Sequence, residues 1–222
     1  MVPILQLIPN RLKKFVRVQF ESIRKKEDSL IPKMEISGKH ISNLIVIQNR
    51  TELLKLLPKN AIVAEIGVDK GEFSEEIMAV CKPEKLHLID VWDSKRYHHG
   101  LMAQVQRKFE DQIKNGCVEI NLGFSTDVGA KCNDHYFDWI YIDTDHSYLT
   151  TKSELEIFSQ KLKSGGIIAG HDFVQGNWIT GYRYGVIEAV YEFCNAFDWE
   201  ILYLTMEINT PRSFAIRKRK EV

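Results

Sequence analysis

Short apolar segments alternate with amphipathic segments from residue 51 to the end of the chain. The apolar segments predict β-strands, and they cover residues 61–66, 86–89, 118–122, 137–142, 167–169, 200–204 and 213–216. Apolar side chains at three- and four-residue spacing predict helices over residues 51–57, 73–80, 99–114, 127–131, 149–162 and 186–195. Strands joined by helices need crossover connections, so we expect an α/β fold with a mostly parallel sheet and helices on both faces.

The first 49 residues have a different pattern. Apolar side chains at positions 12, 15, 16, 20 and 23 share one side of a predicted helix, and residues 1–29 contain seven basic and three acidic residues. We therefore divide the chain into an N-terminal amphipathic helix and linker (1–49) and one domain (50–222). Because most apolar helix faces pack on a core, we expect this helix to cap its own domain. Weak contact with a membrane surface, or with a partner subunit such as a second copy, is the alternative.

Composition narrows the class of protein. The 222 residues include 30 basic and 30 acidic side chains, and a net charge of zero argues against a dedicated nucleic-acid binder. No apolar run reaches the roughly 18 residues that a transmembrane helix needs. The four cysteines form no Cys-x-x-Cys pair, which argues against a disulfide scaffold or zinc ribbon and suits a reducing cytoplasm, so we expect a cytoplasmic protein.

Candidate cofactor contacts lie at the ends of the first three strands, because ligands of parallel α/β sheets bind beyond the carboxyl ends of the strands. Two glycines after the first strand allow a tight turn and close approach of the backbone to a ligand. The middle glycine of the G-x-G-x-x-G dinucleotide motif is absent. An aspartate about twenty residues later is placed to accept hydrogen bonds from ribose hydroxyls. The candidates are Glu65, Gly67, Gly71, Phe73, Asp90, Val91, Trp92, Gly123, Phe124 and Ser125.

Residues at the ends of the fourth and fifth strands make the pattern specific. The blocks are E-x-G-x-x-x-G (65–71), D-W-I-Y-I-D-x-D-H-S-Y (138–148), L-K-x-G-G-I-I-A-G-H-D-F (162–173) and G-V-x-x-A-V-x-x-F (185–193). Together they resemble class I S-adenosylmethionine (SAM)-dependent methyltransferases of the methyltransferase domain 24 group, which is related to macrocin- and catechol-type O-methyltransferases. The resemblance implies a Rossmann-like sheet of seven strands in the order 3-2-1-4-5-7-6.

This strand order makes the fourth and fifth strands neighbours, so Asp143 and the pair His171–Asp172 are expected to converge. Asp143 is predicted to contact both the cofactor and a metal. By resemblance, Asp143, His171 and Asp172 are the predicted ligands of a divalent metal, and Mg²⁺ prefers such carboxylate oxygens. The relatives have Asp-Asp or Asp-Asn where this chain has His-Asp. The imidazole makes Mn²⁺, Fe²⁺ or Zn²⁺ suitable alternatives, or His171 serves as a base.

His146 follows Asp143 by three residues, where catechol-type relatives place a catalytic lysine. A neutral imidazole there is suited to take the proton of an acceptor hydroxyl. The alternative interpretation is that His146 caps the next helix. We therefore predict an enzyme, a SAM-dependent methyltransferase that O-methylates a small-molecule hydroxyl such as that of a sugar or phenol with metal assistance. A non-catalytic SAM-binding module and a metal-independent N-methyltransferase remain open.

Overall fold

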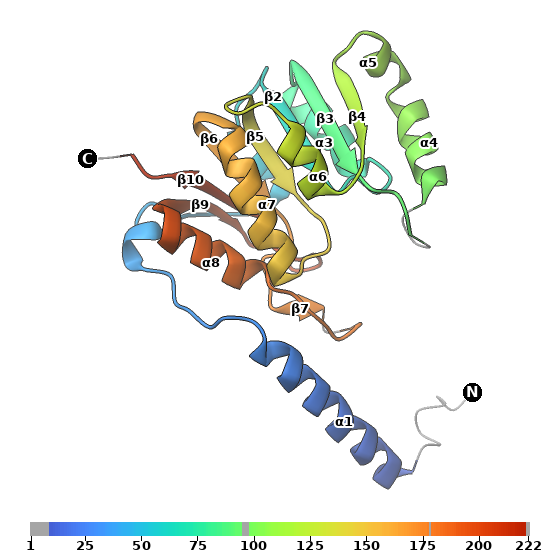
Figure 1. Ribbon diagram of the computed structural model, residues 1–222, viewed down its shortest axis with the longest axis vertical. Helices are drawn as coiled ribbons and strands as arrows, with labels where there is room; N and C mark the ends of the chain where they lie inside the picture. The colour runs from blue at the N-terminus through green and yellow to red at the C-terminus, as the bar shows by residue number, and fades with distance from the viewer. Residues whose placement is uncertain (1–8, 95–97, 178, 221–222) are drawn as a thin grey trace.

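The protein is described here by a computed structural model that covers residues 9–94, 98–177 and 179–220. Its centre is an eight-stranded sheet in the order β1-β9-β10-β6-β5-β2-β3-β4 (Figure 1). Only β10 is antiparallel to its neighbours among these strands. The strands are β1 (Ile45–Ile47), β2 (Ile62–Ile66), β3 (Lys85–Asp90), β4 (Val118–Leu122), β5 (Phe137–Ile142), β6 (Leu162–Gly170), β9 (Trp199–Thr205) and β10 (Phe214–Lys218).

Helices cover both faces of the sheet, as the alternation of elements predicts. The helices of the domain are α2 (Arg50–Leu56), α3 (Glu72–Cys81), α4 (His99–Lys108), α5 (Glu110–Lys114), α6 (Ser125–Lys131), α7 (Tyr148–Lys161) and α8 (Val186–Phe197). Successive residues of a strand point to opposite faces. Val63 of β2 therefore packs in one core with side chains of α2, α3 and α4, whereas Ala64 packs in a second core with side chains of α7 and α8.

Seven of the strands confirm the predicted order. Taken as 3-2-1-4-5-7-6, they are β4, β3, β2, β5, β6, β10 and β9. The eighth, β1, is a correction, because residues 30–49 were expected to be a linker. Instead Ile45 and Ile47 pair in parallel register with Tyr203 and Thr205 of β9. A short 3-10 helix, η2 (Gly38–His40), precedes β1, and His40 is buried against the carbonyl of Trp199. The sheet therefore begins before residue 50.

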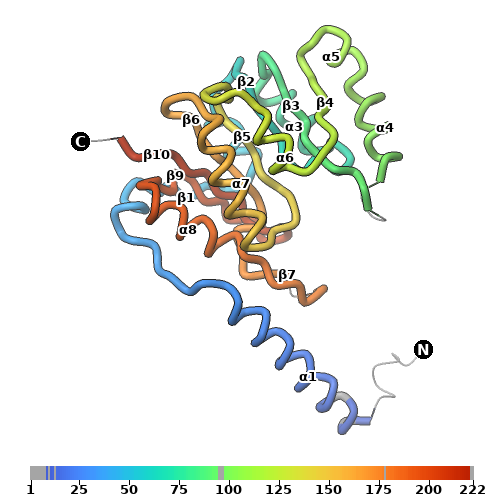
Figure 2. The backbone as a smooth tube through the Cα atoms, viewed as in Figure 1, coloured from blue at the N-terminus to red at the C-terminus, as the bar shows by residue number. Residues whose placement is uncertain are grey.

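The N-terminal helix α1 (Asn10–Ser29) forms as predicted but does not cap the domain. It extends away from the sheet and its helices (Figures 1 and 2). Its attachment lies at its C-terminal end, where the Asp28 carboxylate accepts a hydrogen bond of 2.9 Å from Nε of Arg183 in β8 (Tyr182–Arg183). β8 pairs with β7 (Gly176–Asn177) in a small hairpin. Within the described residues, no helix is long and apolar enough to cross a membrane.

Candidate active site

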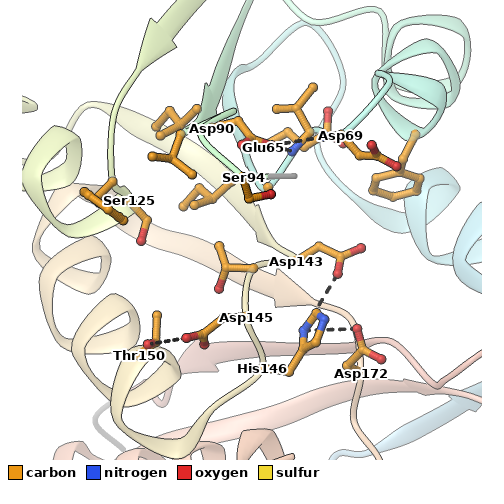
Figure 3. A pocket seen from close by; sticks show the side chains of 18 of the residues that line it. Glu65, Asp69, Asp90, Ser94, Ser125, Asp143, Asp145, His146, Thr150 and Asp172 are labelled. Atoms are coloured by element: carbon orange, nitrogen blue, oxygen red, sulfur yellow. Dashed lines mark hydrogen bonds and ion pairs between the residues drawn. The ribbon is translucent and has the colours of Figure 1, made fainter. Parts of the chain in front are cut away.

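A cavity of about 850 Å³ opens beyond the carboxyl ends of β2 to β6. Eleven of the predicted site residues line it: Glu65, Gly67, Phe73, Asp90, Val91, Gly123, Phe124, Ser125, Asp143, His146 and Asp172. Three others, Gly71, Trp92 and His171, lie behind the lining. Figure 3 shows Glu65, Asp69 and Asp90 on one side of the cavity and Asp143, His146 and Asp172 on the other. The cavity therefore has two differently composed halves: a first half at the ends of β2 and β3, and a second half at the ends of β5 and β6.

The turn from β2 into α3 depends on its glycines. Gly67 has φ of +89°, and a Cβ added there would lie 1.9 Å from the carbonyl oxygen of Asp143. Only glycine lets the turn pass this close to the end of β5. Gly71, with φ of +70°, precedes the first turn of α3, and a Cβ there would contact Phe109 at 3.2 Å. Gly71 therefore shapes the turn from the core side and does not face the cavity.

The carboxylate of Asp90 is used within the protein. Its Oδ2 accepts hydrogen bonds from the backbone N–H groups of Val68 at 2.7 Å and Asp69 at 3.0 Å. Its Oδ1 accepts one from the backbone N–H of Trp92 at 2.9 Å. The Trp92 ring is fully buried, and its Nε1 donates to the Asp69 carbonyl at 2.9 Å. Asp90 and Trp92 thus hold the glycine turn in place, and Trp92 does so from outside the cavity.

Glu65 and Arg50 add charge to this half. Glu65 is 2% exposed, accepts a hydrogen bond from the Ser74 hydroxyl, and its burial raises its pKa to about 8. The Arg50 guanidinium lies 4.5 Å from the centre of the Phe73 ring, and its Nη2 is 3.6 Å from Oε1 of Glu76. Arg50 lines the cavity, yet no sequence argument singled it out. Because it belongs to α2, ahead of the first strand of the methyltransferase-like pattern, a search of strand ends does not reach it.

The other half contains a compact group of two carboxylates and an imidazole. Nδ1 of His146 lies 3.1 Å from Oδ2 of Asp172 and 4.0 Å from Oδ1 of Asp143 (Figure 3). One ligand atom from each of the three residues lies within 4.8 Å of the other two. His146 and Asp172 have φ of +62° and +56°, a conformation that costs free energy outside glycine. The loops after β5 and β6 therefore hold these side chains together at a conformational cost.

His171 lies beside this group but not at the cavity wall. Its Nδ1 is 3.3 Å from Oδ2 of Asp172 and 3.6 Å from Oδ2 of Asp143, and its side chain is 10% exposed. The structure thus brings His146, and not His171, into the group that faces the cavity. That His171 ligates a metal or acts as a base stays a prediction. Its contacts suit a residue that positions the two carboxylates.

Comparison with known proteins identifies the fold and the family. Residues 64–173 match the model of a family described as a methyltransferase domain. This segment runs from β2 through the loop after β6 and contains the whole cavity lining except Arg50, Asn177, Tyr184 and Pro211. These residues form a methyltransferase domain, and the fold is that of the class I SAM-dependent methyltransferases. None of the curated protein sequences matches this methyltransferase significantly.

Solved structures share the fold of this methyltransferase at low sequence identity. A Clostridium thermocellum protein assigned as an rRNA methylase is 17% identical with a TM-score of 0.60, over 80% of this chain and 100% of the other. A Streptococcus mutans protein assigned as a methyltransferase, solved with S-adenosylhomocysteine, is 16% identical with a TM-score of 0.55, over 77% and 96%. The Bacillus subtilis m1A22 tRNA methyltransferase is 13% identical with a TM-score of 0.56, over 79% and 67%. These likenesses establish the fold alone.

Electrostatics distinguish the two aspartates of this methyltransferase. Desolvation, together with the charge of Asp172, raises the pKa of Asp143 to about 7. Burial alone would raise the pKa of Asp172, but the hydrogen bond from His171 and the charge of His146 outweigh it and lower that pKa. Burial opposes protonation of His171, yet the hydrogen bond to Asp172 and the charge of Asp143 raise its pKa. Two carboxylates this close are stabilised by a nearby cation, which the histidines or a metal ion can supply.

Proposed function

We propose that this methyltransferase transfers the methyl group of SAM to the hydroxyl of a small molecule, with assistance from a divalent metal. The observation that supports this proposal is the group formed by Asp143, His146 and Asp172, whose ligand atoms lie within 4.8 Å of one another beside the cofactor half of the cavity. An acceptor placed between the halves would have its oxygen beside these side chains. Positioning of both reactants is a main source of rate enhancement in such transfers.

In this proposal the first half of the cavity, where the main chain forms much of the wall, holds SAM. The glycine turn offers close backbone approach to the carboxypropyl end, and the guanidinium of Arg50 offers a counter-charge for its carboxylate. The adenosine would lie toward Val91, Phe124 and Ser125 at the ends of β3 and β4. The Asp90 carboxylate already accepts three backbone N–H groups. We therefore expect it to act on SAM chiefly by fixing the turn, with one lone pair left for a ribose hydroxyl.

The donor set of the second half fits a divalent metal. Two carboxylates suit Mg²⁺, and the imidazole of His146 extends the set to Mn²⁺, Fe²⁺ or Zn²⁺. When bound, such a cation polarises an acceptor hydroxyl and lowers its pKa. Asp143 and Asp172 would hold it, His146 would complete the set, and His171 would orient the carboxylates through its contacts of 3.3 and 3.6 Å.

A second candidate is methyl transfer without a metal to an oxygen or nitrogen acceptor. The observation that favours it is the 3.1 Å approach of His146 Nδ1 to Asp172 Oδ2. A carboxylate so placed orients an imidazole and stabilises its protonated form, so that the imidazole can take a proton from the acceptor. RNA methylases occur among the structural neighbours. Because this chain has no surplus of positive charge overall, we favour a small-molecule acceptor.

The experiment is a screen of small-molecule acceptors with methyl-labelled SAM, run in chelator and after single additions of Mg²⁺, Mn²⁺, Fe²⁺ and Zn²⁺. We expect methyl transfer by the wild type, and we expect chelation and Asp172→Asn each to abolish it. Asp127→Asn, at an exposed position outside the cavity, should preserve the transfer. Full transfer in chelator would instead select the His146 mechanism. SAM binding without any transfer would select a non-catalytic module, and absence of SAM binding would overturn the proposal.

A further inference from the structure

Helix α1 carries a row of large apolar side chains that nothing in the described chain covers. Single exposed apolar residues are ordinary on a protein surface, but a contiguous row on one side of a helix marks an interaction site. Spacings of three and four residues place the members of the row on one side of α1. They are Leu12, Phe15, Val16, Phe20 and Ile23, each between 43% and 61% exposed.

The charge of α1 is as uneven as its apolar surface. Residues 10–29 hold seven of the 30 basic residues and three of the 30 acidic ones, so α1 has a net charge of +4. The rest of the chain then has 23 basic and 27 acidic residues, a net charge of −4. Arg11, Val18 and Lys25 are spaced by seven residues and therefore share a side of the helix that is distinct from the apolar row.

The attachment of α1 fixes one end of the helix and leaves the other projecting. Arg183 is 14% exposed and contacts Asp28 of α1 and Glu188 of α8 at once. The next residue, Tyr184, lines the cavity, and its ring centre lies 4.8 Å from that of His146. The projecting helix in Figures 1 and 2 is thus joined to the wall of the cavity on the side of the carboxylate group.

We propose that α1 binds the protein to the surface of an anionic lipid bilayer. The apolar row would enter the boundary between headgroups and acyl chains, and the basic side chains would contact lipid phosphates, as in other interfacial amphipathic helices. A second copy of the chain suits the row less well, because pairing two α1 helices brings two charges of +4 together. An anionic surface complements both the apolar and the charged side of α1.

The test is flotation of the full chain with vesicles of pure phosphatidylcholine and with vesicles in which about one third is phosphatidylglycerol. We expect binding to the anionic vesicles and at least ~10-fold weaker binding to the neutral ones. Added salt should weaken the binding because it screens the charges. Lys14→Gln, Arg17→Gln and Lys25→Gln combined lower the net charge of α1 to +1 and should weaken anionic-vesicle binding by at least ~10-fold.

The apolar row has a matched control on the same helix. Phe15→Ser, Phe20→Ser and Ile23→Ser combined should weaken vesicle binding by ~100-fold, because the variant removes apolar area and no charge. Val18→Ser replaces a side chain that is 51% exposed on the side of Arg11 and Lys25, and should bind like the wild type. All these positions are exposed, so SAM binding by calorimetry and the melting temperature should stay unchanged. Failure of the wild type to bind anionic vesicles would overturn the proposal. So would a dimer in lipid-free solution that the triple serine variant abolishes.

Discussion

The two halves of the cavity are built from different parts of the chain. At the ends of β2 and β3 the main chain forms the wall, with Asp90 accepting three backbone N–H groups and Gly67 lying against the Asp143 carbonyl. At the ends of β5 and β6 the wall consists of side chains, and His146 meets Asp143 and Asp172. A substitution in the first half should therefore alter fold and cofactor site together. One in the second half should alter chemistry and leave the fold in place.

The largest effect is expected from Gly67→Ala. Its methyl group would overlap the Asp143 carbonyl, since a Cβ at this position would lie 1.9 Å from that oxygen. The main chain of β2 or β5 must then move, so we expect the free energy of unfolding to fall by ~4 kcal/mol or more, together with loss of SAM binding. Gly165→Ala is the matched control, because Gly165 has a similar φ of +76° and no atom within 4 Å of its added Cβ. It should cost only about 1–2 kcal/mol in thermal or denaturant unfolding. Equal losses would show that contact with β5 contributes nothing.

Asp172→Asn tests the second half. The variant keeps the shape of the side chain and removes one negative charge from the group around His146. We expect methyl transfer to the acceptor found with the wild type to fall by about 1000-fold, equivalent to about 4 kcal/mol, with the melting temperature nearly unchanged. Asp127→Asn should transfer at the wild-type rate. Unimpaired transfer by Asp172→Asn would remove the carboxylate group from the mechanism.

Glu154→Gln tests a buried carboxyl of α7, which accepts a hydrogen bond of 3.0 Å from the Thr144 hydroxyl. Burial raises the pKa of Glu154 from 4.5 to about 7. Between these pH values the folded state binds more protons than the unfolded state, so the free energy of unfolding falls as pH rises through this window. Across the whole window, Glu154 accounts for a fall of about 3 kcal/mol in the free energy of unfolding.

The glutamine variant should match the wild type near pH 4.5 and exceed its stability above pH 7. The stability of the variant should still fall with pH, because burial also raises the pKa values of Glu65 and Asp143. Denaturant unfolding at several pH values measures this difference. Glu84→Gln, at an exposed position, should follow the wild-type curve throughout. A Glu154→Gln curve parallel to the wild type would contradict the assignment of the slope to this carboxyl.

A smaller loss is expected from Asp90→Asn, because one carbonyl oxygen replaces two carboxylate oxygens that accept three backbone N–H groups. Leaving one of these donors without a partner should lower stability by about 1–3 kcal/mol and weaken SAM binding in parallel. Asp93→Asn, three residues further and exposed, should change neither quantity. Weakened SAM binding with full stability would mean that Asp90 acts on the ligand directly and not through the turn.

The sequence predicted the fold wherever a segment was long enough to show its periodicity. Six of the seven strands of the predicted order are apolar segments that lie largely buried between two layers of helices, and the seventh, β4, is a partly exposed edge strand with alternating apolar and polar residues. The sequence did not predict β1, because this strand has only three residues and Ile45 and Val46 are more than half exposed. Its partner β9 also lies over 150 residues away along the chain. The apolar row predicted α1 but not the absence of packing, since periodicity does not say what covers a face.

The sequence predicted the positions of the site residues better than the directions in which their side chains point. Strand ends located the lining residues because the carboxyl ends of parallel strands meet at one edge of the sheet. Trp92 follows the lining residue Val91 and His171 precedes the lining residue Asp172, yet neither Trp92 nor His171 lines the cavity itself. The direction of a side chain depends on backbone conformations such as the positive φ of Trp92 and Asp172, which a motif does not show. Arg50 reaches the cavity from α2 by tertiary packing alone.

The central claim is that the first half of the cavity binds SAM and the second half serves the acceptor. It is tested most directly by titrating SAM into the wild type and Asp172→Asn in a calorimeter. The account predicts that both bind SAM with affinities within about threefold of each other, a difference below about 1 kcal/mol, because the variant lies in the acceptor half. Gly67→Ala should show no binding in the same experiment. Absence of binding by the wild type, or a tenfold or greater loss in Asp172→Asn, would contradict it.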